Sequence, residues 1–101
     1  MNHRNLCSGL IPLHLLHYAA KGSIFGQAVI DELGRHGYRL SAGTLYPILH
    51  NMERQGYLRS QSRLDKGRKR RVYRITLAGR KALDTAQMRV RELFGEMFEP
   101  D

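Results

Sequence analysis

The chain has 101 residues, of which 42% are hydrophobic, so it is long enough for one domain with a single core. Seventeen Lys and Arg against nine Asp and Glu give a formal net charge of +8, which favours nucleic acid or an anionic membrane surface as partner. Apolar runs are too short to cross a bilayer, and the single cysteine, Cys7, has no partner for an internal disulfide. We therefore expect a soluble, cytoplasmic protein with no membrane partner.

Two helices are predicted in the first third of the chain. Residues 11–20 are apolar nearly all round, and Pro12 fits there if it lies in the first helical turn. Gly22 ends this helix, and the Ser23 hydroxyl can cap a second helix over residues 24–35. The apolar residues of the second helix recur at helical spacing and are Phe25, Ala28, Val29 and Leu33.

The third predicted helix carries most of the functional information. Its core-facing stripe has i, i+3, i+4, i+7 spacing and consists of Leu45, Ile48, Leu49 and Met52. Other side chains of this helix then face outward, where they can contact a partner: Tyr46, Pro47, His50, Asn51 and Arg54. The helix start has two solutions. With Thr44 as N-cap, Pro47 lies in the first turn at little cost, whereas a start at Ser41 costs one internal hydrogen bond.

After Gly56 the pattern changes to a period of two. Residues 57–64 and 71–76 alternate as β-strands do, and we expect them to pair as an antiparallel hairpin. The turn predicted between them, residues 65–70, contains Asp and Gly. Five of the six residues 66–71 are cations that repel one another without a counter-anion, so this tip is a candidate contact for nucleic acid.

A final helix is predicted over residues 77–98, with Thr76 as its N-cap. Its apolar residues recur at alternating spacings of three and four, which is typical of a helix-pairing seam. They are Leu83, Ala86, Val90, Leu93 and Met97, with Phe94 and Phe98 beside them. Charge also changes here: residues 53–81 hold eleven cations and two acids, whereas residues 84–101 hold five acids and two cations. The last helix should therefore face away from a polyanion.

Three helices followed by a hairpin with a basic tip predict a mainly α (α+β) fold, a winged helix-turn-helix with a two-stranded wing. In such a domain the third helix enters the major groove, about 12 Å wide, and the wing reaches the DNA backbone or the minor groove. We expect residues 1–76 to form this DNA-binding part and residues 77–101 a dimerisation helix, the two making one compact unit.

Two stretches of the chain resemble PadR-type transcriptional regulators, bacterial winged-helix repressors that bind operators as homodimers. Residues 41–58 contain Gly43-Thr44-Leu45-Tyr46-Pro47 and are similar to the family's Gly-Thr-Leu-Tyr-Pro helix and its Leu-Glu-x-x-Gly-Leu step. Residues 67–80 are similar to the family's wing strand, with Lys69 in place of a proline and Val72 in place of a tyrosine. The short tail after Leu83 is similar to that of members that dimerise through a single C-terminal helix.

The resemblance implies that Tyr46 and its neighbours approach an operator and that Arg68 and Arg70 lie near phosphates or in the minor groove. It also implies a homodimer on double-stranded DNA and admits a small aromatic effector near the dimer interface. The candidate DNA-binding residues are Ser41, Thr44, Tyr46, Pro47, His50, Asn51, Arg54, Lys66, Arg68, Lys69, Arg70 and Arg71. The candidate dimerisation residues are Leu83, Ala86, Val90, Leu93, Phe94 and Met97.

Several residues admit a second interpretation. Tyr46 could pack between helices, and Tyr73 is expected to be structural. His14 and His17 are too few for a metal site, so no metal or cofactor is expected. No catalytic constellation is present, which argues against an enzyme. The rival hypotheses are a winged helix that grips an acidic protein and an RNA-binding domain, which would need exposed stacking aromatics.

Overall fold

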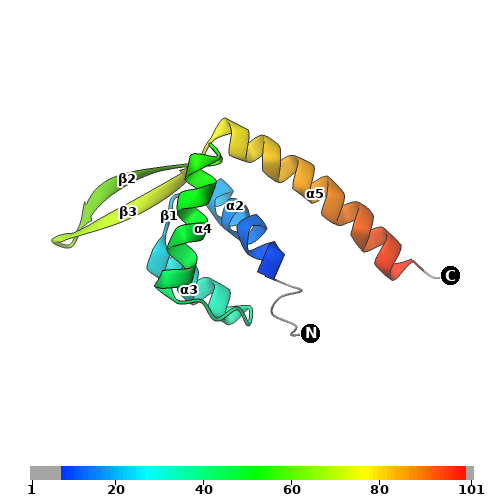
Figure 1. The fold of residues 1–101 in the computed structure, drawn as a ribbon, viewed down its shortest axis with the longest axis horizontal. Coiled ribbons are helices and arrows are strands. Elements are labelled where there is room, and N and C mark those ends of the chain that lie inside the picture. Colours follow the sequence, from blue (N-terminus) through cyan, green and yellow to red (C-terminus); the bar gives the residue numbers. More distant parts are fainter. Residues whose placement is uncertain (1–7, 100–101) are drawn as a thin grey trace.

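The computed structural model describes residues 8–99, so Cys7 lies outside the described part. Figure 1 shows a compact body from which a β-hairpin and a long helix leave in opposite directions. In chain order the elements are the 3-10 turn η1 (Ser8–Leu10), α2 (Ile11–Lys21), β1 (Ile24–Phe25), α3 (Gly26–Arg35), α4 (Ala42–Arg54), β2 (Leu58–Asp65), β3 (Arg68–Ile75) and α5 (Leu77–Phe98). Three helices and then a hairpin is the predicted winged-helix order.

Helix α2 confirms the first prediction, with Pro12 in its opening turn, where a missing N–H costs nothing. It lies against β3 and α5 at the centre of the fold. The core gathers around it and is made of the buried side chains Ile11, Leu15, Leu16, Ala19, Ile24, Val29, Leu33, Leu45, Leu49, Met52, Leu58, Tyr73 and Leu83. Tyr73 is fully buried, as its predicted structural role requires.

The prediction for residues 24–35 is wrong at its start. Ile24 and Phe25 form the short strand β1, which pairs with Tyr73 and Val72 of β3 and extends the wing to a three-stranded sheet in the order β1-β3-β2. Helix α3 begins at Gly26 after an extended Phe25, so the predicted Ser23 cap is also wrong. A β-branched and an aromatic residue beside a free strand edge favour pairing over helix. Ala28, predicted to face the core, is exposed.

The structure resolves the two possible starts of α4 in favour of Ser41. The Ser41 hydroxyl accepts a hydrogen bond from the Thr44 N–H at 3.3 Å, which caps the helix. Pro47 then lies inside the helix, where its missing N–H leaves one bond unmade. Leu45, Leu49 and Met52 are buried as predicted and Ile48 is half-buried, so the orientation of α4 about its axis is the expected one.

The hairpin is longer than predicted and its turn is shorter. Asp65 pairs with Arg68, so the loop consists of Lys66 and Gly67 alone, both with positive φ (51° and 79°). A two-residue loop with positive φ at both positions matches the right-handed twist of the strands. Residues 68–70, predicted in the turn, therefore belong to β3.

Helix α5 has the predicted bounds and the predicted cap. The Thr76 hydroxyl accepts from the Gly79 N–H at 3.0 Å and donates to the Gly56 carbonyl, which ties the helix start to the end of α4. The first part of α5 packs on α2, and its later part leaves the body of the domain (Figure 1).

Candidate nucleic-acid interface

The outward face of α4 presents polar side chains that suit a nucleic acid. Six predicted contact residues are exposed on it: Ser41, Thr44, Pro47, His50, Asn51 and Arg54. The Ser41 and Thr44 hydroxyls lie 3.3 Å apart at the helix N-terminus, where exposed N–H groups favour an anion. Arg54 donates to the Asn51 side-chain oxygen at 3.3 Å, so these two side chains lie together on the last turn of the helix. Both retain donors for a partner.

Tyr46 differs from this outward group because it is half-buried between α3 and α4. A Cβ built on Gly26 would lie 2.2 Å from the Tyr46 hydroxyl oxygen, so the glycine provides the space that the phenol occupies. Tyr46, predicted on the outward face with helix packing as the alternative, therefore packs partly against α3. Its ring centroid lies 6.3 Å from that of exposed His50, so its accessible part borders the polar face of α4.

The cations of the wing divide into two groups. Lys66, Arg68 and Lys69 are exposed and take part in none of the salt bridges found within residues 8–99. Arg70 is held instead, with its guanidinium carbon 4.5 Å from the centre of the Phe25 ring and its Nε 3.6 Å from an Asp65 carboxylate oxygen. The three cations at the tip thus remain available to an anion, whereas Arg70 is engaged in the sheet.

A junction between α4 and the wing could not be predicted from the sequence patterns. The Glu53 carboxylate accepts from the Ser60 hydroxyl at 2.7 and 2.8 Å and from the Ser60 N–H at 2.9 Å. Arg71 in turn donates to the Ser60 hydroxyl at 3.0 Å, so this predicted DNA contact is partly used inside the chain. Hydrogen bonding by the Ser60 side chain is the main cause that lowers the pKa of Glu53, against an opposing effect of burial.

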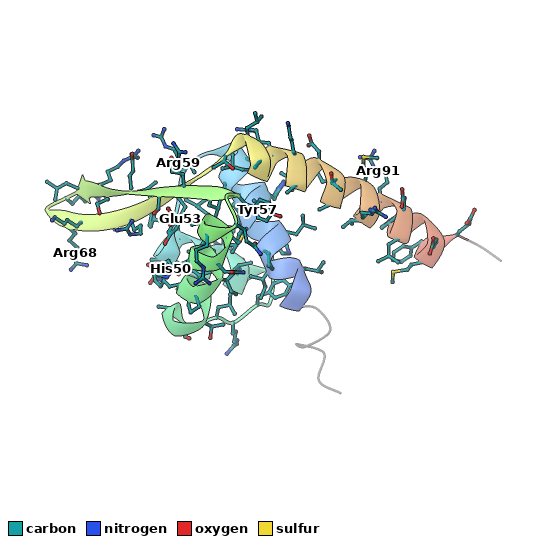
Figure 2. All side chains as sticks on the ribbon, turned by 45° about the horizontal axis from the view of Figure 1, so that its top comes forward. His50, Glu53, Tyr57, Arg59, Arg68 and Arg91 are labelled. Atoms are coloured by element: carbon teal, nitrogen blue, oxygen red, sulfur yellow. The ribbon has the colours of Figure 1, made fainter. Side chains whose placement is uncertain are left out.

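This junction connects the two elements that would meet DNA. Glu53 is on the last turn of α4, and Ser60 and Arg71 are on β2 and β3. Figure 2 shows Glu53 between the helix and the hairpin. A contact between side chains of different elements leaves no periodic trace in the sequence, and alternation alone marks Ser60 as an ordinary strand residue. The carboxylate thus joins the end of α4 to the wing by hydrogen bonds.

The predicted dimerisation residues do not all share one environment. Leu83 is buried in the core of its own chain, and Ala86 is half-buried. The others are exposed by 44% to 66% on the projecting part of α5: Val90, Leu93, Phe94 and Met97. Beside them, an open groove of about 350 Å³ between α2 and α5 is lined by Leu10, Leu13, His14, His17, Leu83, Gln87 and Val90.

Of the two histidines of α2, His14 packs among aromatic rings, whereas His17 is exposed. The His14 ring lies 5.3 Å from Tyr38 and 6.0 Å from His36, between centroids, and burial is the main cause that lowers its pKa. Within residues 8–99, no group of three His, Cys, Asp or Glu side chains is arranged to hold a metal ion. The same part of the chain contains no helix long and apolar enough to span a membrane.

Comparison with known proteins identifies the group to which this geometry belongs. The family model for the transcriptional regulator PadR-like family matches residues 15–85. The chain is 49% identical to the transcriptional regulator Rv3488 of Mycobacterium tuberculosis over 87 residues. The aligned region covers 86% of this chain and 81% of that protein.

Solved structures give the same result for the fold. A PadR family regulator from Eggerthella lenta matches with a TM-score of 0.81 at 27% identity, over 96% of this chain and 88% of that one. A regulator from Thermoplasma acidophilum matches with a TM-score of 0.76 at 26% identity, over 96% and 98%. The family consists of transcriptional regulators and not of enzymes. The exposed face of α4, the basic hairpin and these matches together show that the chain belongs to the PadR-like family of transcriptional regulators.

Proposed function

We propose that this regulator is a homodimeric repressor that binds a pseudo-palindromic operator. The observation that carries the proposal is the polar, exposed face of α4 beside a hairpin whose tip holds three cations without a salt bridge in the described part of the chain. The helix would enter the major groove and the wing would meet the adjacent backbone. A two-fold dimer would place its two α4 helices in successive major grooves, roughly 34 Å apart.

Each candidate residue has a role that its position supports. Ser41 and Thr44, at the helix N-terminus, would bind phosphate and position the helix. His50 and Asn51 carry the donors and acceptors that read base edges. Arg54 would hold Asn51 in place or take a phosphate, and Tyr46 and Pro47 would border the DNA. The wing would contribute backbone contacts from Lys66, Arg68 and Lys69, with Arg70 and Arg71, which also make contacts inside the chain, beside them.

The dimer would form through α5 and the groove beside it. Exposed apolar side chains at positions 90, 93, 94 and 97 repeat at heptad spacing, and in a monomer they would face water. The groove between α2 and α5 continues this apolar surface toward the body, so the α5 helix of a second copy would cover both. In this arrangement residues 1–76 are the DNA-binding part and residues 77–101 the dimerisation part.

Two further properties belong to the same proposal. A small aromatic effector would bind between subunits, near the groove that His14 and His17 line, and release the operator. The protein would act in the cytoplasm, where a bacterial operator is located.

The test is discrimination between operator and scrambled duplex by variants of α4. The operator is obtained by genomic fragment selection. We expect His50→Ala with Asn51→Ala to lose most of the preference for this operator over scrambled duplex, because each base contact contributes about 1–3 kcal/mol of discrimination. Fluorescence anisotropy with both duplexes measures it. The control is Thr85→Ala, an exposed position of α5. Unchanged preference in the α4 variant would contradict the proposed role of the helix.

A further inference from the structure

The wing carries a second set of cations on its outer face, the side turned away from the helices. Directly paired residues of an antiparallel hairpin share a face, and the face alternates along each strand. The pairs that contain buried Leu58 and Tyr73 lie on the inner face. The alternate pairs therefore lie on the outer face: Arg59↔Arg74, Gln61↔Val72, Arg63↔Arg70 and, at the tip, Asp65↔Arg68. Figure 2 shows Arg59 on the side of the hairpin opposite to His50.

This outer face holds two pairs of like charges directly opposite each other, an arrangement that destabilises a sheet unless an anion compensates it. Arg70 is compensated by Asp65 and Phe25. Arg59, Arg63 and Arg74 are exposed, and no carboxylate within residues 8–99 forms a salt bridge with them. Their stems border Val72, which is buried on the same face, but their charges remain uncompensated within the described residues.

The shape of the face fits an extended anion. A hollow of about 380 Å³ at the root of the wing is lined by Arg59, Ser60, Gln61, Arg74, Ile75, Thr76 and Leu77. A second hollow, of about 290 Å³ near the tip, includes Arg63 and Arg70. The two arginine pairs are four residues apart along each strand, about 13 Å at the usual rise. A small carboxylate is too short to reach both arginine pairs or both hollows, whereas a row of phosphates is long enough.

We infer that the outer face of the wing binds the phosphate backbone of a second DNA duplex while α4 and the wing tip hold the operator. This inference rests on the proposed function, because a regulator bound at an operator has other duplex DNA around it at high local concentration. The guanidinium group matches phosphate oxygens in a bidentate fork, and three of these arginines have exposed side chains. The regulator would thus join two segments of DNA.

The experiment is a bridging assay. Operator duplex is fixed to beads and loaded with the protein, and a fluorescent duplex of scrambled sequence is then added at low salt. We expect the native protein to retain the fluorescent duplex and Arg59→Gln with Arg74→Gln to load on the operator equally but retain about tenfold less. The salt dependence of retention should become shallower by about 2 in log–log slope, one for each lost phosphate contact. The matched control is Arg89→Gln with Arg91→Gln on α5.

The outcomes separate this inference from the function on which it rests. Failure of the native protein to load on operator beads in preference to scrambled beads would overturn both. Normal loading without retention of the second duplex would overturn the inference alone, as would retention that survives the loss of Arg59 and Arg74. Displacement of the fluorescent duplex by polyglutamate as readily as by unlabelled duplex would also overturn it, because the partner would then be an acidic protein segment.

Discussion

At the scale of single residues, two glycines set how closely neighbouring elements approach. A Cβ on Gly26 would lie 2.2 Å from the hydroxyl of Tyr46, which is the end of a side chain. A Cβ on Gly79 would lie 2.2 Å from the carbonyl oxygen of Tyr57, which is backbone. The first clash can be relieved by changing the facing side chain, and the second cannot.

We therefore predict opposite results from two double-mutant cycles. Gly26→Ala should lower the free energy of unfolding by about 1–3 kcal/mol in the native chain and cost almost nothing in a Tyr46→Ala background. Gly79→Ala should be equally harmful with or without Tyr57→Ala. Urea unfolding of the single and double variants measures both cycles. A full cost of Gly26→Ala without Tyr46 would show that the phenol does not fill this space.

Glu53 provides a prediction on pH. Its pKa in the folded protein lies below its ordinary value of 4.5, so its contribution to stability is complete above that value and is lost as the pH falls through the folded pKa. Glu53→Gln should cost about 1 kcal/mol at pH 7, and the difference from the native protein should shrink below pH 4.5. Urea unfolding across this range measures it. Glu96→Gln, an exposed α5 control, should show no such convergence; a pH-independent gap for Glu53→Gln would contradict the junction.

At the scale of elements, the wing separates cations that meet DNA from cations that hold the sheet. Lys66→Ala with Arg68→Ala should leave stability unchanged and make the slope of log affinity against log salt shallower by roughly 2 for each subunit, about 4 for the proposed dimer, because each lost cation removes one phosphate contact. Arg70→Ala should instead lower the free energy of unfolding by about 0.5–1 kcal/mol, because its contact with Phe25 is lost. Anisotropy titrations at several salt concentrations and thermal melts distinguish the two effects. An unchanged slope for the tip variant would remove the tip from the interface.

Elements with strong periodicity could be predicted from the sequence, and those set by distant pairing could not. The core stripe of α4 and the full length of α5 follow from 3.6-residue spacing and from caps within three residues. Strand β1 is only two residues long, and it exists because Ile24 and Phe25 find the edge of β3, nearly fifty residues later. Hydrogen-bonded pairing at that distance overrides a local preference for helix.

The candidate site shows the same division. The exposed face of α4 and the cations of the wing could be predicted because they are local patterns of residue type. The packing of Tyr46 on Gly26, the position of Arg70 over Phe25 and the Glu53 junction could not, since each joins positions on different elements. These contacts determine which residues of the α4 face and the wing remain available to a partner.

At the scale of the whole molecule, the exposed stripe on α5 predicts the oligomeric state. Helix α5 has 22 residues and is about 33 Å long, so its projecting part offers a seam of several turns to a second copy. Leu93→Asp should give a folded monomer, because Leu93 is 54% exposed in the single chain and its replacement leaves the core intact. Light scattering gives the mass and circular dichroism the helix content.

The matched control for this seam is Leu64→Asp. Leu64 is an exposed leucine of the wing, outside the α5 stripe, so the variant should keep the mass of the native protein. A dimer that persists in Leu93→Asp would show that subunits join elsewhere.

Sequence-specific binding is the central claim, and selection of genomic fragments by the native protein, followed by a mobility shift at two salt concentrations, tests it most directly. We predict an enriched pseudo-palindrome with half-sites about one helical turn apart, bound saturably and more weakly at the higher salt. Salt-sensitive binding with no enriched sequence would contradict the claim, because the positive surface would then recognise only charge.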